Sequence, residues 1–208
     1  MIRWLARRAV FALGIACVSL PFSVCAASKG VPEPPPCAET IEQLERRPLQ
    51  ELFLKKSGEF RLDRAAGCLK SGELEVPAVL LLLPDYTESY AVRVVAPIAK
   101  TYVAPKVQML DANLTPTREV DATGFKRRGT EISTEIFLNA ENSMERYLLV
   151  QPDLQRVGQF DARLVTVIDP IFVGTGIVMG GKEQTKTVSA VDSGPLVISL
   201  LGGRWKAD

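Results

Sequence analysis

Residues 131–139 read EISTEIFLN, and the order of their side chains decides the fold class. One set of alternate positions holds Ile132, Thr134, Ile136 and Leu138. The positions between them hold Ser133, Glu135 and Phe137. Because successive side chains of an extended chain point to opposite faces, this period of two predicts a strand with one face toward a core.

Short segments on both sides of this stretch extend the prediction. SYAVRVVAP (89–97) and ERYLLVQP (145–152) alternate in the same way. VPAVLLLLP (76–84) is apolar throughout, which predicts a strand buried on both faces. Further strands are predicted at RLVTVID (163–169), TKTVSAV (185–191) and PLVISLL (195–201). Many short strands separated by turn-rich stretches predict a mainly β chain, an antiparallel β-sandwich or jelly roll, with residues 37–208 as a single domain.

The connections carry their own local signals. In VQMLDANLTPTREV (107–120), Asp111 and Asn113 favour a turn through their short side chains, and Pro116 limits where the next strand begins. AETIEQLERRPLQELF (38–53) predicts a short N-terminal helix that ends before Pro48. PDLQRVGQF (152–160) predicts a further helical turn.

The first 27 residues have the three-part order of a secretory signal peptide. Three arginines precede an uncharged run of 12 residues from Ala9 to Leu20, and small residues follow. A spanning helix needs roughly 20 apolar residues, so we expect cleavage and export to the periplasm, with no membrane span in the mature protein. A membrane anchor and lipidation at Cys17 or Cys25 are the alternatives. Residues 28–36 form a proline-rich tether.

Charge and histidine content exclude several classes of function. Residues 28–208 hold 22 basic and 24 acidic residues, a net charge of −2, which disfavours nucleic acid as a partner. The chain has no histidine, so hydrolases with a Ser-His-Asp or Cys-His arrangement are excluded and the commonest metal ligand is missing. No cofactor is expected, and we predict that the protein is not an enzyme.

Cys37 and Cys68 are the two cysteines that remain after cleavage of the signal peptide. Unpaired thiols are uncommon in an oxidising compartment, so we predict a disulfide between them. Two buried thiols are the alternative.

Three other stretches are candidates for chemical sites. FVGTGIVMGG (172–181) has neither the spacing nor the following helix of a phosphate-binding loop, and it predicts a flexible apolar loop at one edge of the sandwich that can serve as an interaction surface. A calcium site at Asp111 and Asn113 lacks a ligand-rich loop. FKRRG (125–129) predicts a solvated loop tip. A glycan hydrolase would need two carboxylates that face each other across a cleft. The candidates for such a pair are Asp85, Glu88, Asp111, Asp121, Glu131, Glu135, Asp161 and Asp169.

Aromatic residues at predicted turns and strand ends are the candidates for binding a sugar. Flat aromatic faces stack on sugar rings, but an aromatic side chain in a sandwich also serves as core. The candidate ligand-facing residues are Tyr86, Tyr90, Tyr102, Phe125 and Trp205.

The order of motifs resembles that of the maltose operon periplasmic protein family, over approximately residues 37–153. The resemblance rests on a cysteine before a short L…PL segment, an apolar run ending in Leu-Pro, and the stretches YAVRVVAP, VAPKVQMLDANLTPTRE and ERYLLVQPD. It implies a periplasmic, β-rich, non-catalytic accessory protein of maltose or maltodextrin uptake, with an outer-membrane porin or an oligosaccharide as partner. It implies no catalytic or sugar-binding residue. A cell-envelope glycan hydrolase and an adhesion module that uses residues 172–181 remain as alternatives.

Overall fold

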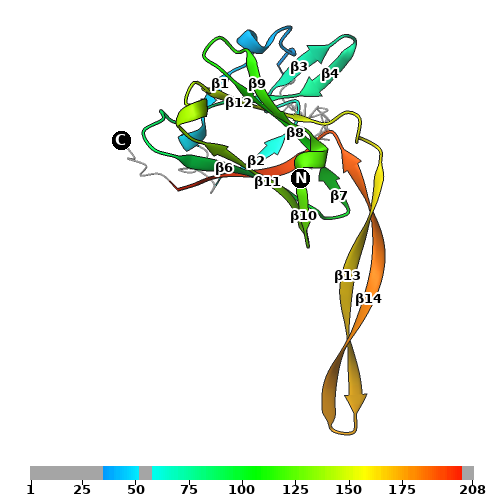
Figure 1. Ribbon diagram of the computed structural model, residues 1–208. Coiled ribbons are helices and arrows are strands. Elements are labelled where there is room, and N and C mark those ends of the chain that lie inside the picture. Colours follow the sequence, from blue (N-terminus) through cyan, green and yellow to red (C-terminus); the bar gives the residue numbers. More distant parts are fainter. Residues whose placement is uncertain (1–34, 52–57, 203–208) are drawn as a thin grey trace, which may run out of the picture. The chain divides into compact units, whose positions relative to one another are not determined.

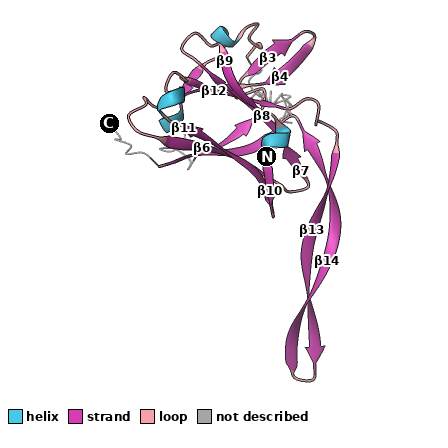
Figure 2. Ribbon diagram, in the orientation of Figure 1, coloured by secondary structure: helices cyan, strands magenta, loops and turns pink. Residues whose placement is uncertain are grey.

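The computed structural model describes residues 35–51 and 58–202 of the 208-residue chain. The predicted signal peptide, most of the proline-rich tether and Trp205 lie outside these residues. The described part consists mainly of strands (Figures 1 and 2), and two five-stranded sheets form the sandwich. The predicted mainly β fold, with antiparallel sheets in a sandwich, is confirmed.

The first sheet has the strand order β1-β5-β12-β8-β9. Its pairs are antiparallel except β1 with β5, which is parallel. The strands are β1 (Arg46–Pro48), β5 (Val79–Leu82), β12 (Tyr147–Pro152), β8 (Pro105–Leu110) and β9 (Pro116–Val120).

The second sheet has the order β10-β11-β6-β15-β2 and is antiparallel throughout. Two of the three segments predicted from a period of two, 89–97 and 131–139, supply neighbouring strands of this sheet, whereas the third, 145–152, belongs to the first sheet. The strands are β10 (Lys126–Arg128), β11 (Glu131–Leu138), β6 (Tyr90–Pro97), β15 (Gly194–Leu201) and β2 (Glu59–Leu62). The FKRRG stretch is therefore not a loop tip, because Lys126–Arg128 pair with Glu131–Ser133.

The main core fills the space between the two sheets. Alternate residues of β6 and β11, such as Val92 and Ile136, meet Leu81 of β5 and Leu148 of β12 in one buried cluster. Burial of each such aliphatic side chain contributes about 1.5–3 kcal/mol. The alternation read from the sequence therefore identifies the inner face of the second sheet.

A smaller cluster covers the outer face of the first sheet. Leu80 of β5 and Leu149 of β12 pack there against Leu44 and Leu69. β5 is thus buried on both faces, as its unbroken apolar run predicts. The covering layer contains β3 (Cys68–Ser71) and β4 (Leu74–Pro77), which form a hairpin.

The disulfide predicted between Cys37 and Cys68 is present. It joins the N-terminal segment to β3, and two backbone hydrogen bonds of Ala38 support the same junction. The Ala38 amide donates to the Cys68 carbonyl, and the Lys70 amide donates to the Ala38 carbonyl, both at 2.9 Å. The layer over the first sheet is therefore held covalently and by its backbone.

Helical structure is less extensive than the sequence predicts. The helix expected before Pro48 is one 3-10 turn, η1 (Ile41–Gln43), because Arg46–Pro48 are extended and pair with Leu80–Leu82. Residues 154–158 form turns, not the predicted helical turn. The other 3-10 turns are η2 (Ala122–Gly124) and η3 (Ala140–Asn142). None of the helices in the described residues is long and apolar enough to cross a membrane.

The 107–120 stretch forms β8, a turn and β9, as predicted. One carboxylate oxygen of Asp111 accepts the amides of Asn113 at 2.8 Å and Thr115 at 2.9 Å. Leu114 takes a positive φ of 62°, which lets the chain reverse within this turn. Asp111 is therefore a turn-forming residue.

Candidate functional site

A long β-hairpin is the feature that the sandwich does not need for its own core. It consists of β13 (Phe160–Val173) and β14 (Gly176–Val191), joined by Gly174 and Thr175 (Figure 1). Gly174 has a φ of +60°, and a glycine at the first position of a two-residue turn is typical of a type II′ hairpin. The register is regular from Phe160 opposite Ser189 to Val173 opposite Gly176.

This hairpin corrects the prediction of a flexible loop at residues 172–181. Only residues 174 and 175 form the turn, and the rest of that stretch belongs to the two strands. The strands predicted at 163–169 and 185–191 are therefore the inner halves of much longer ones.

Most of the hairpin lacks a third strand. β14 pairs with β7 (Thr101–Val103) through Ser189–Val191 alone, and β13 is the edge of this three-stranded sheet. Within the described part of the chain, residues 161–188 of the hairpin therefore pair only with each other. Both outer edges leave backbone amides and carbonyls open to other strands.

Several large apolar side chains of this ribbon have exposed fractions from 60% to 75%, whereas residues 182–187 of β14 are exposed and polar. Even-numbered positions of β13 and odd-numbered positions of β14 lie on one face, and Phe172 is opposite Ile177 there. We name this surface the apolar hairpin face, and it consists of Phe160, Leu164, Ile168, Phe172, Ile177 and Met179. Single exposed apolar side chains are ordinary, but such a group on one face marks an interaction surface.

Polar contacts fix the root of the hairpin on the sandwich. The Arg127 guanidinium donates to the Ala162 carbonyl at 2.6 Å, and that of Arg163 donates to the Ile98 carbonyl at 2.8 Å. The Tyr102 hydroxyl donates to the Asp161 carboxylate. Burial, followed by this hydrogen bond, raises the pKa of Tyr102. The direction in which the hairpin leaves the sandwich is therefore set by several independent contacts.

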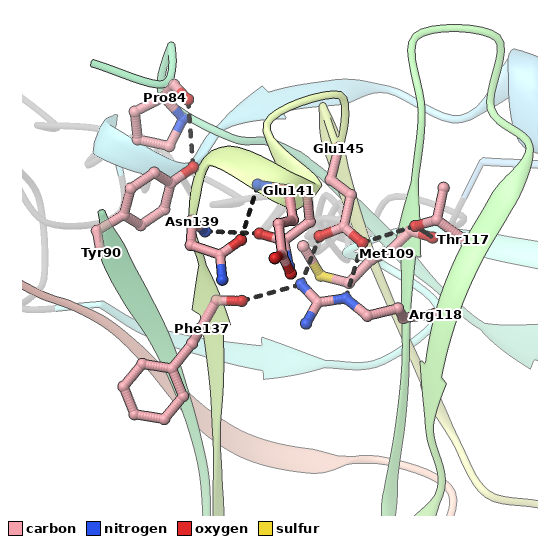
Figure 3. A network of polar contacts seen from close by, with 10 residues as sticks. Pro84, Tyr90, Met109, Thr117, Arg118, Phe137, Asn139, Glu141 and Glu145 are labelled. Carbon is pink, nitrogen blue, oxygen red and sulfur yellow. Dashed lines mark hydrogen bonds and ion pairs between the residues drawn. The ribbon is translucent and has the colours of Figure 1, made fainter. Parts of the chain in front are cut away.

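A second polar cluster, drawn in Figure 3, is centred on the buried carboxylate of Glu145. Arg118 donates to its two oxygens, from Nε at 2.7 Å and from Nη2 at 2.5 Å, and Thr117 Oγ1 donates at 2.8 Å. Arg118 Nη2 also donates to the carbonyl of Phe137 in the second sheet. The donors around Glu145 all come from its own chain. Because Arg118 binds both Glu145 and the Phe137 carbonyl, we interpret the cluster as a structural link between the two sheets.

Several of the carboxylates considered for glycan hydrolysis form ion pairs or hydrogen bonds with other residues of the chain. Arg146 binds Asp85 at 2.6 Å, and Arg93 binds Glu131 at 2.7 Å. Asp121 caps η2 through the amides of Thr123 and Gly124, and its pKa is lowered by a hydrogen bond from the Thr123 side chain. Groups of three or more potential metal ligands are absent from the described residues.

The candidate sugar-facing aromatic residues do not form a surface. Tyr90, Tyr102 and Phe125 are only 4%, 5% and 8% exposed and belong to the main core. The expectation that these three side chains are exposed toward a ligand is wrong, because they pack among the apolar residues of the main core. Tyr86 is half-buried against the same core.

One aromatic residue that the sequence analysis did not select is exposed beside polar groups. Phe137 of β11 is 64% exposed. It lines a hollow of about 180 Å³ with Lys126, Thr134 and Glu135. Phe137 lies between Ile136 and Leu138 in β11, so its side chain points to the face opposite their buried side chains. This alternation in the sequence could have indicated that Phe137 is exposed.

Comparison with known proteins adds no relative. No family model, curated protein or solved structure matches this chain.

Proposed function

We propose that this chain is a non-catalytic, exported binding protein whose apolar hairpin face docks on another protein of the cell envelope. The observation that carries the proposal is the row of exposed apolar side chains on a hairpin whose root is fixed. A surface that is already ordered loses less conformational entropy when it binds, so it is suited to docking.

The chemistry of the hairpin favours a protein over a lipid bilayer. Residues 170–181 read PIFVGTGIVMGG and carry no charge. However, both outer edges of the ribbon present unpaired backbone groups, and hydrocarbon offers them no hydrogen-bond partners. A protein supplies both an apolar surface and backbone partners, so it satisfies the whole hairpin.

The process in which this docking takes part is proposed from the signal peptide and the family resemblance. We propose an accessory role in maltose or maltodextrin uptake in the periplasm, with an outer-membrane porin as the docking partner. The neutral balance of the chain, without a histidine, supports a binding role over a catalytic one.

Binding to purified maltoporin tests this function. The mature protein is compared with a Phe172→Thr/Ile177→Thr/Met179→Gln variant, which keeps strand-compatible side chains and removes the outer part of the apolar hairpin face. A Val165→Thr/Val167→Thr variant changes the opposite face of β13 and is the matched control. We expect the first variant to bind at least about tenfold more weakly and the control to bind within about twofold of wild type.

Circular dichroism confirms that each variant is folded. Equal binding by all three proteins contradicts docking through the apolar hairpin face. Absence of binding by the wild-type protein contradicts the porin as the partner.

Phe137 supports a second candidate function, the binding of an oligosaccharide. An exposed aromatic face beside a hydroxyl, an ammonium and a carboxylate matches the mixture of apolar and polar groups on a sugar ring. Calorimetry with maltodextrins tests it. We expect the wild-type protein and Phe172→Ala to give the same heat of binding, and Phe137→Ala to give none. Absence of a binding heat for the wild-type protein rejects this second function.

A further inference from the structure

The free edge of β13 has a residue order that suits pairing with a second copy of itself. Residues 160–172 read FDARLVTVIDPIF, which is nearly symmetric about Thr166. In an antiparallel pair centred on Thr166, the facing residues are Phe160 with Phe172, Arg163 with Asp169, Leu164 with Ile168, and Val165 with Val167. In these four pairs, aromatic, charged, aliphatic and β-branched residues meet a suitable counterpart. The remaining two pairs are Asp161 with Ile171, which are not matched in polarity, and Ala162 with Pro170.

The backbone of β13 is directed correctly for this pairing. The Ala190 amide donates to the Gln159 carbonyl, and the Ala162 carbonyl accepts from Arg127 outside the hairpin. Because antiparallel residues alternate between bonding inward and outward, odd positions of β13 bond to β14 and even positions face outward. Leu164, Thr166 and Ile168 therefore present their backbone groups at the free edge.

Pro170 is the residue expected to oppose strand addition, since it has no amide to donate. In the symmetric register Pro170 faces Ala162 of the other copy. The Ala162 carbonyl is the one that Arg127 already occupies at 2.6 Å. The amide that Pro170 lacks would have faced the Ala162 carbonyl, which already accepts from Arg127. The absence of this amide therefore costs the proposed pair no hydrogen bond.

Charge supports the same register. Residues 163 and 169 carry opposite charges in the sequence, and opposite charges that face each other across two strands are favourable. The symmetric pairing places Asp169 of the second copy opposite Arg163. The free edge of β14 is less suited, because Gly180 and Gly181 interrupt it and Lys182 follows.

We infer that two copies of this chain associate through β13, antiparallel and centred on Thr166, to form a four-stranded sheet with the order β14-β13-β13-β14. Facing residues of an antiparallel pair lie on the same side of the sheet, so the two apolar hairpin faces join into one surface. The association is closed by its twofold symmetry. This inference rests on the proposed function, because the joined face is the surface offered to the envelope partner.

Paired Thr→Pro variants test the inference in sedimentation and light-scattering experiments on the mature protein. Thr166→Pro removes an outward amide at the centre of the proposed pair, and Thr185→Pro removes an outward amide from the free edge of β14. Both changes leave the bonds between β13 and β14 in place. We expect a dimer for wild type and Thr185→Pro, and half that mass for Thr166→Pro.

Cysteine cross-linking tests the register separately. Facing residues that exchange backbone hydrogen bonds have Cα atoms about 5.5 Å apart, within disulfide range. Thr166→Cys is therefore expected to form a disulfide dimer on mild oxidation. The two copies of Thr185 would lie on opposite edges of the four-stranded sheet, at least about 14 Å apart, so Thr185→Cys is expected to remain monomeric on a non-reducing gel.

A monomeric wild-type protein overturns the inference, as does a dimer that Thr166→Pro leaves intact and Thr166→Cys fails to cross-link. Neither result removes docking by the apolar hairpin face, which is measured with maltoporin. Conversely, a dimer whose Phe172→Thr/Ile177→Thr/Met179→Gln variant binds maltoporin normally overturns the proposed function and leaves the pairing through β13 standing.

Discussion

Removal of the Cys37–Cys68 disulfide is the perturbation whose cost follows most directly from the structure. Both cysteines are buried, and their sequence separation is 31. A Cys37→Ala/Cys68→Ala variant keeps small apolar side chains at both positions. The backbone bonds of Ala38 with Cys68 and Lys70 also remain available. The main change is therefore the freedom that the unfolded chain gains.

The magnitude comes from the entropy of closing that loop. For a loop of about 30 residues, the chain-entropy relation gives about 12 cal/mol/K, or about 3.7 kcal/mol at 25 °C. We expect the free energy of unfolding to fall by about 3–4 kcal/mol. With a urea m-value of about 2 kcal/mol/M, the midpoint falls by about 1.5–2 M.

Urea unfolding followed by far-ultraviolet circular dichroism measures the change. The reduced wild-type protein is the matched control, because it loses the same covalent link without a substitution, and its curve is expected to coincide with that of the double variant. A decrease below about 1 kcal/mol in both proteins would show that the link does not restrict the unfolded chain, and would refute the reasoning.

Two further predictions concern buried polar groups. Glu145→Gln removes the charge that binds Arg118; since Arg118 is 37% exposed and water screens it, urea unfolding should show a loss of only about 1–2 kcal/mol. Glu119→Gln on β9 is the exposed control, and an equal loss there contradicts the structural link between the two sheets. Burial raises the pKa of Tyr90 from 10.0 to about 12, so the unfolded chain releases this proton first. The contribution of Tyr90 to the free energy of unfolding is complete below pH 10 and is lost between pH 10 and about 12. Tyr90→Phe should flatten the fall of the unfolding free energy over this range, and an unchanged slope contradicts this prediction.

The central strands could be predicted because one physical cause acts on them. In β6 and β11, one alternating set of residues, such as Val92 and Ile136, packs in the main core. Burial alternates with exposure in the second half of β11, whereas most residues of β6 are buried on its other face as well. In β5 the period disappears, and the sequence correctly indicated two buried faces. It did not indicate that the outer layer comes from the N-terminal segment and β3, which lies over Leu80 through long-range contacts.

Local propensity failed where a distant strand decided the conformation. The segment before Pro48 has helical spacing of Ile41 and Leu44, yet Arg46–Pro48 join the edge of the first sheet beside β5. Pairing with Leu80–Leu82 supplies backbone hydrogen bonds to an ordered sheet, which a short isolated helix lacks. A reading of local pattern alone cannot include that contribution.

The length of the hairpin could not be predicted for a related reason. Outside its root, the hairpin has no core against which to alternate, so Ile168, Phe172 and Met179 are exposed and the glycines at 180 and 181 obscure the strand signal. The sequence of 172–181 indicates an interaction surface but not a strand. The pairing of Phe160 with Ser189 through Val173 with Gly176 is what reveals the full length of β13 and β14.

The distribution of buried residues argues that the hairpin was selected for a contact outside this chain. Of its residues, Val188 and Ala190 belong to the main core, and both lie at its root. Beyond them, the exposed apolar side chains stabilise nothing in the sandwich, while burial of each against a partner would contribute about 1.5–3 kcal/mol. Exposure on this scale also favours aggregation, so it persists where a partner covers it. The fixed root and the nearly symmetric edge of β13 are the observations from which we propose two covering contacts, a second copy at the edge and an envelope protein on the face.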